Sequence, residues 1–231
     1  MKGGNSCLSS SNLPIGQVIQ GDCLSVLKRF PPQSVDNVII DIPYNVGKDY
    51  GNDSDRQTKD DYNKFLYDRF EIIEKVLKPN AHVLVFTSIK YIDETMRILD
   101  CFFSRVWILC WIAVNKRSRS TIGYNLWQPI LLYAKGKSSY IGKQDTYFYT
   151  TGQEFYNHPT PKPQALLEHL LKDFTKEGDI ILDAFLGSGT TAVACEKLRR
   201  KWIGIEINPE YCAIARKRLE PWMNQMRLDS L

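Results

Sequence analysis

Short apolar runs alternate with amphipathic stretches along most of the chain. Five of these runs are rich in valine and isoleucine and apolar at consecutive positions, as central parallel strands covered on both faces are. They span residues 17–20, 37–41, 82–86, 180–184 and 202–206. Strands that alternate with helices in this way predict an α/β fold with a largely parallel sheet.

Three stretches between or after these strands have apolar residues at helical spacing. The first spans residues 62–77 and the second spans residues 166–174. The third begins with Asn208 as its N-cap and Pro209 in its first turn, an arrangement that favours a helix start. We therefore predict three amphipathic helices that pack against the sheet.

The middle of the chain breaks the alternation. Two β-like aromatic stretches, residues 106–113 and 126–133, are separated by a polar loop at residues 115–120. We predict that they form an antiparallel edge of the sheet together with a small insertion at about residues 114–156. We expect residues 15–231, with this insertion, to form one domain, because a chain of this length suffices for one sizeable core.

Composition adds few constraints to this picture. The chain has 231 residues, of which 43% are hydrophobic and 24% charged, and no apolar run has the length of a membrane span. Residues 1–14 are rich in glycine, serine and asparagine, so we expect a flexible tail and no signal peptide. The six cysteines are scattered without a CxxC pair, so we predict no metal site and a reducing cytoplasm.

The formal net charge of +4 permits nucleic-acid binding without arguing for it, because a local basic patch decides that question. The most concentrated basic cluster is Lys116, Arg117 and Arg119, beside the aromatic residues Tyr124 and Trp127. We predict that this cluster contacts DNA phosphates. A solvated loop would have the same composition.

A glycine-rich turn, Asp183-Ala-Phe-Leu-Gly-Ser-Gly-Thr-Thr191, follows the fourth predicted strand and opens a helix. Gly187 and Gly189 allow a ligand to approach the backbone and the helix N-terminus closely. One strand later, Glu206 can accept both hydroxyls of a ribose. The turn alone fits a nicotinamide-dependent oxidoreductase and a methyl-donor enzyme equally well, since Ala192 completes the G-x-G-x-x-G/A pattern. A turn without any ligand also stays open.

A second candidate site is Asp41-Ile-Pro-Tyr44, at the carboxyl end of a predicted parallel strand, where ligands bind. The lone pair of an adenine amine is delocalised into the ring, so the amine is a poor nucleophile. Asp41 and a backbone carbonyl could accept its two N–H bonds and free the lone pair. Pro43 fixes one φ angle, and Tyr44 offers a face for an extruded base. In isolation, an ordinary strand-ending turn explains these residues too.

With both segments in this order, the chain resembles the permuted β group of amino-methylating DNA methyltransferases. That family has a catalytic [D/N/S]-[P/I]-P-[Y/F] motif first, a recognition region in the middle and an F-x-G-x-G loop last. The resemblance implies that the insertion at about residues 114–156 carries target recognition. Two further segments match, Gly21-Asp22-Cys23 and His158-Pro-Thr-Pro-Lys-Pro163. Ile42 and Ala184 replace prolines that are commoner in the family, and neither change removes a reactive group.

The resemblance implies a circularly permuted, Rossmann-like methyltransferase sheet. It also implies transfer of a methyl group from S-adenosylmethionine to N6 of an adenine flipped out of duplex DNA. Asp41 favours adenine N6, and cytosine N4 is the alternative. An oxidoreductase would leave Asp-Ile-Pro-Tyr and His-Pro-Thr-Pro-Lys-Pro unexplained. A homodimer and a cognate restriction endonuclease are further partners that the resemblance allows.

The family's functional positions map onto this chain residue by residue. Asp41, Pro43 and Tyr44 are the implied catalytic residues. In the family, the counterpart of Asp22 contacts the cofactor's adenine amine, and the counterpart of Lys162 helps to hold its methionine part. The implied cofactor-binding residues are Asp22, Asp41, Lys162, Asp183, Phe185, Gly187, Gly189, Thr190 and Glu206.

Overall fold

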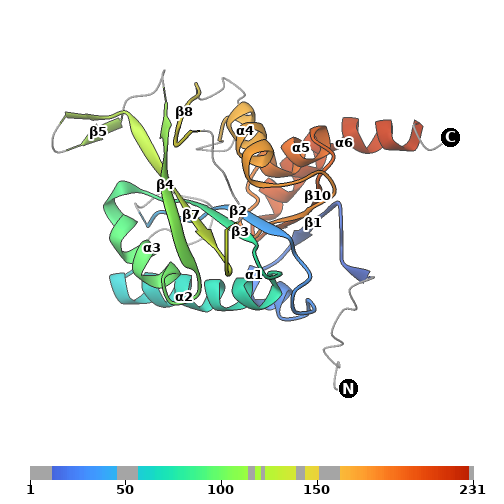
Figure 1. Cartoon of the computed structure of the whole chain (residues 1–231). Coiled ribbons are helices and arrows are strands. Elements are labelled where there is room, and N and C mark those ends of the chain that lie inside the picture. The colour runs from blue at the N-terminus through green and yellow to red at the C-terminus, as the bar shows by residue number, and fades with distance from the viewer. Residues whose placement is uncertain are drawn as a thin grey trace.

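An eight-stranded sheet runs through the middle of the molecule (Figure 1). The computed structural model describes residues 12–45, 57–113, 118–120, 123–138, 144–150 and 162–228. The strand order is β1-β10-β9-β2-β3-β7-β4-β8. The strands of this sheet are β1 (Gln17–Gln20), β2 (Asn37–Asp41), β3 (His82–Phe86), β4 (Ser104–Ile112), β7 (Trp127–Ala134), β8 (Thr146–Phe148), β9 (Ile180–Asp183) and β10 (Lys201–Glu206).

The sheet has a parallel half and an antiparallel half. Strands β1, β10, β9, β2 and β3 pair in parallel, whereas β7 pairs antiparallel with both β3 and β4, and β8 pairs parallel with β4. The α/β fold, the five parallel strands and the antiparallel pair predicted from the middle of the chain are thus confirmed, with bounds within two residues. The circular permutation stays a prediction.

Helices cover both faces of the sheet. The helices are α1 (Cys23–Leu27), α2 (Lys59–Val76), α3 (Ile92–Leu99), α4 (Gln164–Phe174), α5 (Thr190–Lys197) and α6 (Pro209–Leu228), with a 3-10 turn at Ile89–Tyr91. Helices α1, α2 and α3 share one core cluster, and α4, α5 and α6 share the other (Figure 1). Successive side chains of a central strand belong to the two clusters in turn. In β3, Val83 and Val85 lie in the first cluster, and Leu84 and Phe86 lie in the second.

Two predictions about the elements need correction. Strand β1 is an edge strand rather than a central one, and both of its glutamines are exposed, so its two apolar residues alone are packed. The predicted loop at residues 115–120 ends early, because β5 (Ser118–Ser120) pairs with β6 (Gly123–Asn125) as a separate two-stranded hairpin. These strands are short and lack apolar alternation, so no pattern marked them.

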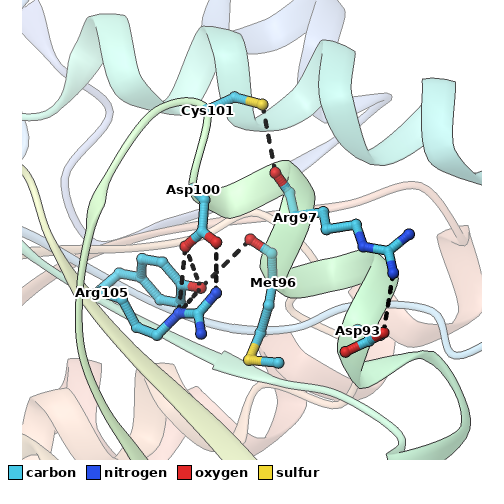
Figure 2. A network of polar contacts seen from close by, with 7 residues as sticks. Asp93, Met96, Arg97, Asp100, Cys101 and Arg105 are labelled. Carbon is cyan, nitrogen blue, oxygen red and sulfur yellow. Dashed lines mark hydrogen bonds and ion pairs between the residues drawn. The ribbon is translucent and has the colours of Figure 1, made fainter.

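A polar network fastens α3 to the antiparallel half of the sheet. Arg105 of β4 forms an ion pair with Asp100, just after α3 (Figure 2). The Tyr133 hydroxyl, on β7, donates to Asp100 Oδ1 at 2.9 Å and accepts from Arg105 Nε at 3.1 Å. Burial raises the pKa of Tyr133 well above its ordinary value, which keeps the hydroxyl protonated as a donor. The network fixes β7, the strand that supplies Gln128 to the site.

Most of the predicted tail lies outside the described residues, although Leu13 packs against the first core cluster. Within the part of the chain that the structure describes, no helix is both long and apolar enough to cross a membrane. The thiols of Cys23, Cys195 and Cys212 are buried and unpaired with one another, in the places expected of core residues.

Candidate active site

A cavity of about 270 Å³ opens beyond the carboxyl ends of β1, β2, β9 and β10. Parallel strands expose their ligand sites at this edge. Among the predicted catalytic and cofactor-binding residues, Gly189 and Tyr44 are absent from the cavity wall. The predicted residues that line the cavity are Asp22, Asp41, Pro43, Lys162, Asp183, Phe185, Gly187, Thr190 and Glu206.

Glu206 fastens the glycine-rich turn to the end of β10. One carboxylate oxygen accepts from the Gly187 backbone N–H at 2.8 Å, and the other accepts from the Asn208 N–H at 2.8 Å. Gly187 has φ +53°, in the left-handed region that favours glycine. Burial raises the pKa of Glu206, although the backbone N–H groups oppose the shift. Glu206 therefore shapes the turn as well as facing the cavity.

Gly189 lies where the glycine-rich turn packs against α6. It is the N-cap of α5, has φ +83°, and a Cβ at this position would lie 2.9 Å from the Cβ of Ala215 on α6. On the same side, Arg218 Nη1 donates to the Ser188 carbonyl at 2.7 Å and to the Thr190 hydroxyl at 3.0 Å. Helix α6 thus holds the turn in place, and Gly189 contributes by allowing close packing.

Asp183 is fully buried at the end of β9. Burial raises its pKa to about 7, and the nearby charges of Asp41 and Glu206 add to the shift. Hydrogen bonds from Thr191 and from the Phe185 N–H, the latter at 3.1 Å, oppose it. A carboxyl group with this pKa ionises readily when a cation binds beside it.

Asp41, at the end of β2, is bound through both carboxylate oxygens. Oδ1 accepts from the Tyr44 hydroxyl at 2.6 Å, and Oδ2 forms an ion pair with Lys162. The Lys162 ammonium also lies 5.3 Å from the ring centroids of Tyr44 and of Phe86. Gln128 Nε2, from β7, donates to the Tyr44 hydroxyl. The structure therefore brings Lys162 and the turn at residues 41–44 together at a single carboxylate.

Asp22 occupies the far end of the cavity. It caps the N-terminus of α1, and its Oδ1 accepts from Arg69 Nη2 at 2.7 Å. The Arg69 guanidinium stacks 3.6 Å above the Phe65 ring, whose centroid lies 6.1 Å from that of Phe185. Sequence reasoning missed Arg69, Phe65 and Gln128 as parts of the site. Phe65 and Arg69 are four residues apart on α2, but only the fold shows that this helix face reaches the cavity.

The predicted DNA-binding cluster is placed only in part. Lys116 and Arg117 lie outside the described residues, and Arg119 falls in β5, where the backbone alone is described. Tyr124 and Trp127 are exposed, at 55% and 41%, near the hairpin that carries this cluster. The cluster's contact with DNA stays a prediction. Among the described residues, no group of three His, Cys, Asp or Glu side chains could hold a metal ion.

The residues around the cavity suit a cationic ligand with an adenosine part. Asp41, Asp183 and Glu206 are three carboxylates, and Lys162 is the ammonium beside them. Asp22, Phe65 and Phe185 add an acceptor and apolar rings at the other end. S-adenosylmethionine carries a sulfonium, an ammonium, a carboxylate and an adenine, so its chemistry fits this set of groups.

Comparisons with known proteins agree with this chemistry. A profile of the DNA methylase family that acts on N6 or N4 amines matches residues 35–217. The chain is 32% identical to the type II methyltransferase M.HpaI of Haemophilus parainfluenzae, over 90% of this chain and 75% of that protein. It is 28% identical to the DNA adenine methyltransferase YhdJ of Escherichia coli K12, over 88% and 82% of the two chains.

Solved structures share the fold. The M1.HpyAVI–SAM complex matches with a TM-score of 0.72 and 27% identity, over 88% of this chain and 98% of that one. The cytosine-N4-specific PvuII DNA methyltransferase matches with a TM-score of 0.75 and 21% identity, over 93% and 88%. The family profile covers most of the chain, from the strand that carries Asp41 to the helix that follows Glu206. The chain therefore belongs to the N6/N4 DNA methylase family.

Proposed function

We propose that this protein uses S-adenosylmethionine to methylate N6 of an adenine that is flipped out of duplex DNA. The observation that carries the proposal is the position of Asp41, which faces the same cavity as Asp183 and Glu206. One end of the cavity thus offers an acceptor for an amine, next to carboxylates that suit a cationic donor. The M1.HpyAVI structure, solved as a complex with SAM, supports this donor.

The chain's own groups have distinct tasks in this proposal. Asp41 accepts hydrogen bonds from the target amine, which localises the nitrogen lone pair, and Tyr44 stacks on the extruded base. Asp183 and Glu206 hold the cationic and ribose parts of the donor, and Asp22 accepts from its adenine amine. When bound, S-adenosylmethionine supplies a methyl group that its sulfonium already activates. The carboxylates then stabilise positive charge that develops on the target nitrogen.

Gly187, Gly189 and Phe185 shape the donor pocket, and Thr190 offers a hydroxyl or N–H to the donor's carboxylate. Pro43 keeps the catalytic turn rigid, and its carbonyl accepts from the buried Tyr62 hydroxyl at 2.6 Å. That bond ties the catalytic turn to α2. Preorganisation of this kind lets a small site orient the amine without reorganisation at the moment of transfer.

Adenine is favoured over cytosine by an aspartate at position 41 and by the 28% identity to YhdJ, whose name specifies adenine. Cytosine N4 is the second candidate, because PvuII methyltransferase, which is cytosine-N4-specific, has the same fold. Double-stranded DNA is the proposed partner. M.HpaI is named a type II methyltransferase, which supports a cognate restriction endonuclease as a further partner. A homodimer stays a prediction.

The test is to incubate the protein with unmethylated genomic DNA and labelled S-adenosylmethionine, digest the DNA and separate the nucleosides. Label in N6-methyladenine is the expected result, and label in N4-methylcytosine would correct the base. A protein that binds NADH but not S-adenosylhomocysteine would instead be an oxidoreductase. The variant Asp41→Ala should lose methyl transfer and still bind S-adenosylhomocysteine. Near-normal turnover in that variant would refute the role of Asp41.

A further inference from the structure

Lys162 occupies the place at Asp41 that the proposed function assigns to the target amine. Its side chain is only 9% exposed, and its ammonium is enclosed by the Asp41 carboxylate and the rings of Tyr44 and Phe86. The second oxygen of Asp41 is bound by Tyr44. Both carboxylate oxygens of Asp41 thus have partners within the chain.

The proposed donor brings a carboxylate of its own into this cavity, and Lys162 is the only ammonium among the described residues of the cavity wall. One ammonium cannot neutralise two carboxylates at full strength, so the two partners compete for it. Arg69 is the other cation on the described cavity wall, and it is paired with Asp22. No second cation of the described wall therefore stands ready to replace Lys162 at either carboxylate.

Resting on the proposed function, we propose that Lys162 is a positioning residue shared between the two ligand sites. In the free protein it neutralises Asp41. When the donor binds, its carboxylate attracts Lys162, and Asp41 becomes available to the target amine. The shared lysine couples the sites, so that donor binding favours capture of the flipped base. Such a coupling is reciprocal for binding free energies.

This arrangement has a physical reason. A carboxylate of the site without a partner would be costly in a cavity that already contains Asp183 and Glu206. Lys162 removes that cost until a ligand arrives. A base that is flipped before the donor binds would have to displace Lys162 from Asp41, which makes its capture weaker than in the presence of the donor.

The experiment compares two ligands that differ only in the carboxylate, S-adenosylhomocysteine and its decarboxylated analogue. Their dissociation constants are measured by calorimetry for the wild type, Lys162→Met, Asp41→Asn and the double variant. Asp41→Asn frees Lys162, so the affinity for S-adenosylhomocysteine should rise roughly five- to tenfold relative to the affinity for the analogue. Lys162→Met should weaken S-adenosylhomocysteine about tenfold relative to the analogue. In the double variant, Asp41→Asn should change the dissociation constant of neither ligand relative to Lys162→Met alone.

Controls separate a shared lysine from a structural one. Lys162→Arg retains the charge, so in this background Asp41→Asn should still raise part of the affinity for S-adenosylhomocysteine over that for the analogue. Lys64→Met, on the exposed face of α2, should change the affinity for neither ligand. If a folded Lys162→Met protein lost affinity for both ligands equally, Lys162 would have only a structural role. An unchanged ligand ratio in Asp41→Asn would overturn the competition while leaving the donor assignment intact. Failure of the wild type to bind either ligand would instead refute the proposed function.

Discussion

Replacing Asp183 with asparagine should stabilise the folded protein at neutral and alkaline pH. Burial raises the Asp183 pKa from 3.8 to about 7. Between these values the folded state holds a proton that the unfolded state releases, so the stability contributed by this group is lost as pH rises. The difference between the pKa of 3.8 and that of about 7 corresponds to about 4 kcal/mol, lost in full above pH 7. Asparagine has no such charge to bury.

The assay is urea unfolding of the wild type and of Asp183→Asn at pH 5 and at pH 8. The difference in unfolding free energy between the variant and the wild type should grow by about 3 kcal/mol from pH 5 to pH 8, because most of the range between pH 3.8 and pH 7 lies in this interval. Asparagine has nearly the shape of aspartate, its carbonyl can accept from the Phe185 N–H, and its amide can donate to the Thr191 hydroxyl. Asp68→Asn is the control, because it removes the negative charge of a carboxylate that is 35% exposed on α2 instead of a buried one. An advantage that does not depend on pH would refute the reasoning.

Three further changes test the site and its support. Glu206→Gln should weaken the binding of S-adenosylhomocysteine at least about tenfold in calorimetry, because the amide NH₂ of glutamine would face a backbone N–H and could not accept from it. An unchanged affinity would remove Glu206 from the pocket. Gly189→Ala should lower the unfolding free energy by roughly 2–4 kcal/mol in urea, since it strains φ and meets Ala215. Tyr133→Phe should lower the unfolding free energy by about 1 kcal/mol in the same assay, because it removes the hydrogen bond from the hydroxyl to Asp100.

The sheet could be predicted well from sequence because its central strands are buried on both faces. Strands β2 and β3 have continuous apolar runs, and the structure gives them the predicted bounds. The edges were harder to predict. Strand β1 has a polar residue at each end, and the hairpin of β5 and β6 has no apolar pattern at all. Edge position and short polar pairings depend on tertiary neighbours, which local pattern does not encode.

The site was predictable where a motif follows a strand. Asp41, Asp183 and Glu206 each end a parallel strand, so topology alone brings them to one edge. Gln128 and Arg69 could not be foreseen in this way. They come from the interior of a strand and of a helix, and no spacing in the sequence relates them to the motifs they contact. The partner of Lys162 was likewise hidden, because Asp41 lies 121 residues away in the chain.

The raised pKa of Asp183 also predicts that donor binding is linked to a proton. Near pH 7 about half of this carboxyl is protonated in the free protein, since its pKa is about 7. A cation bound beside it favours the charged form, so binding should release up to about half a proton. Calorimetry of S-adenosylmethionine binding in two buffers of different ionisation enthalpy measures this release, and Asp183→Asn should abolish it. Identical enthalpies in both buffers for the wild type would mean that the carboxyl does not change its protonation on binding, and that Asp183 supports the turn without facing the donor's charge.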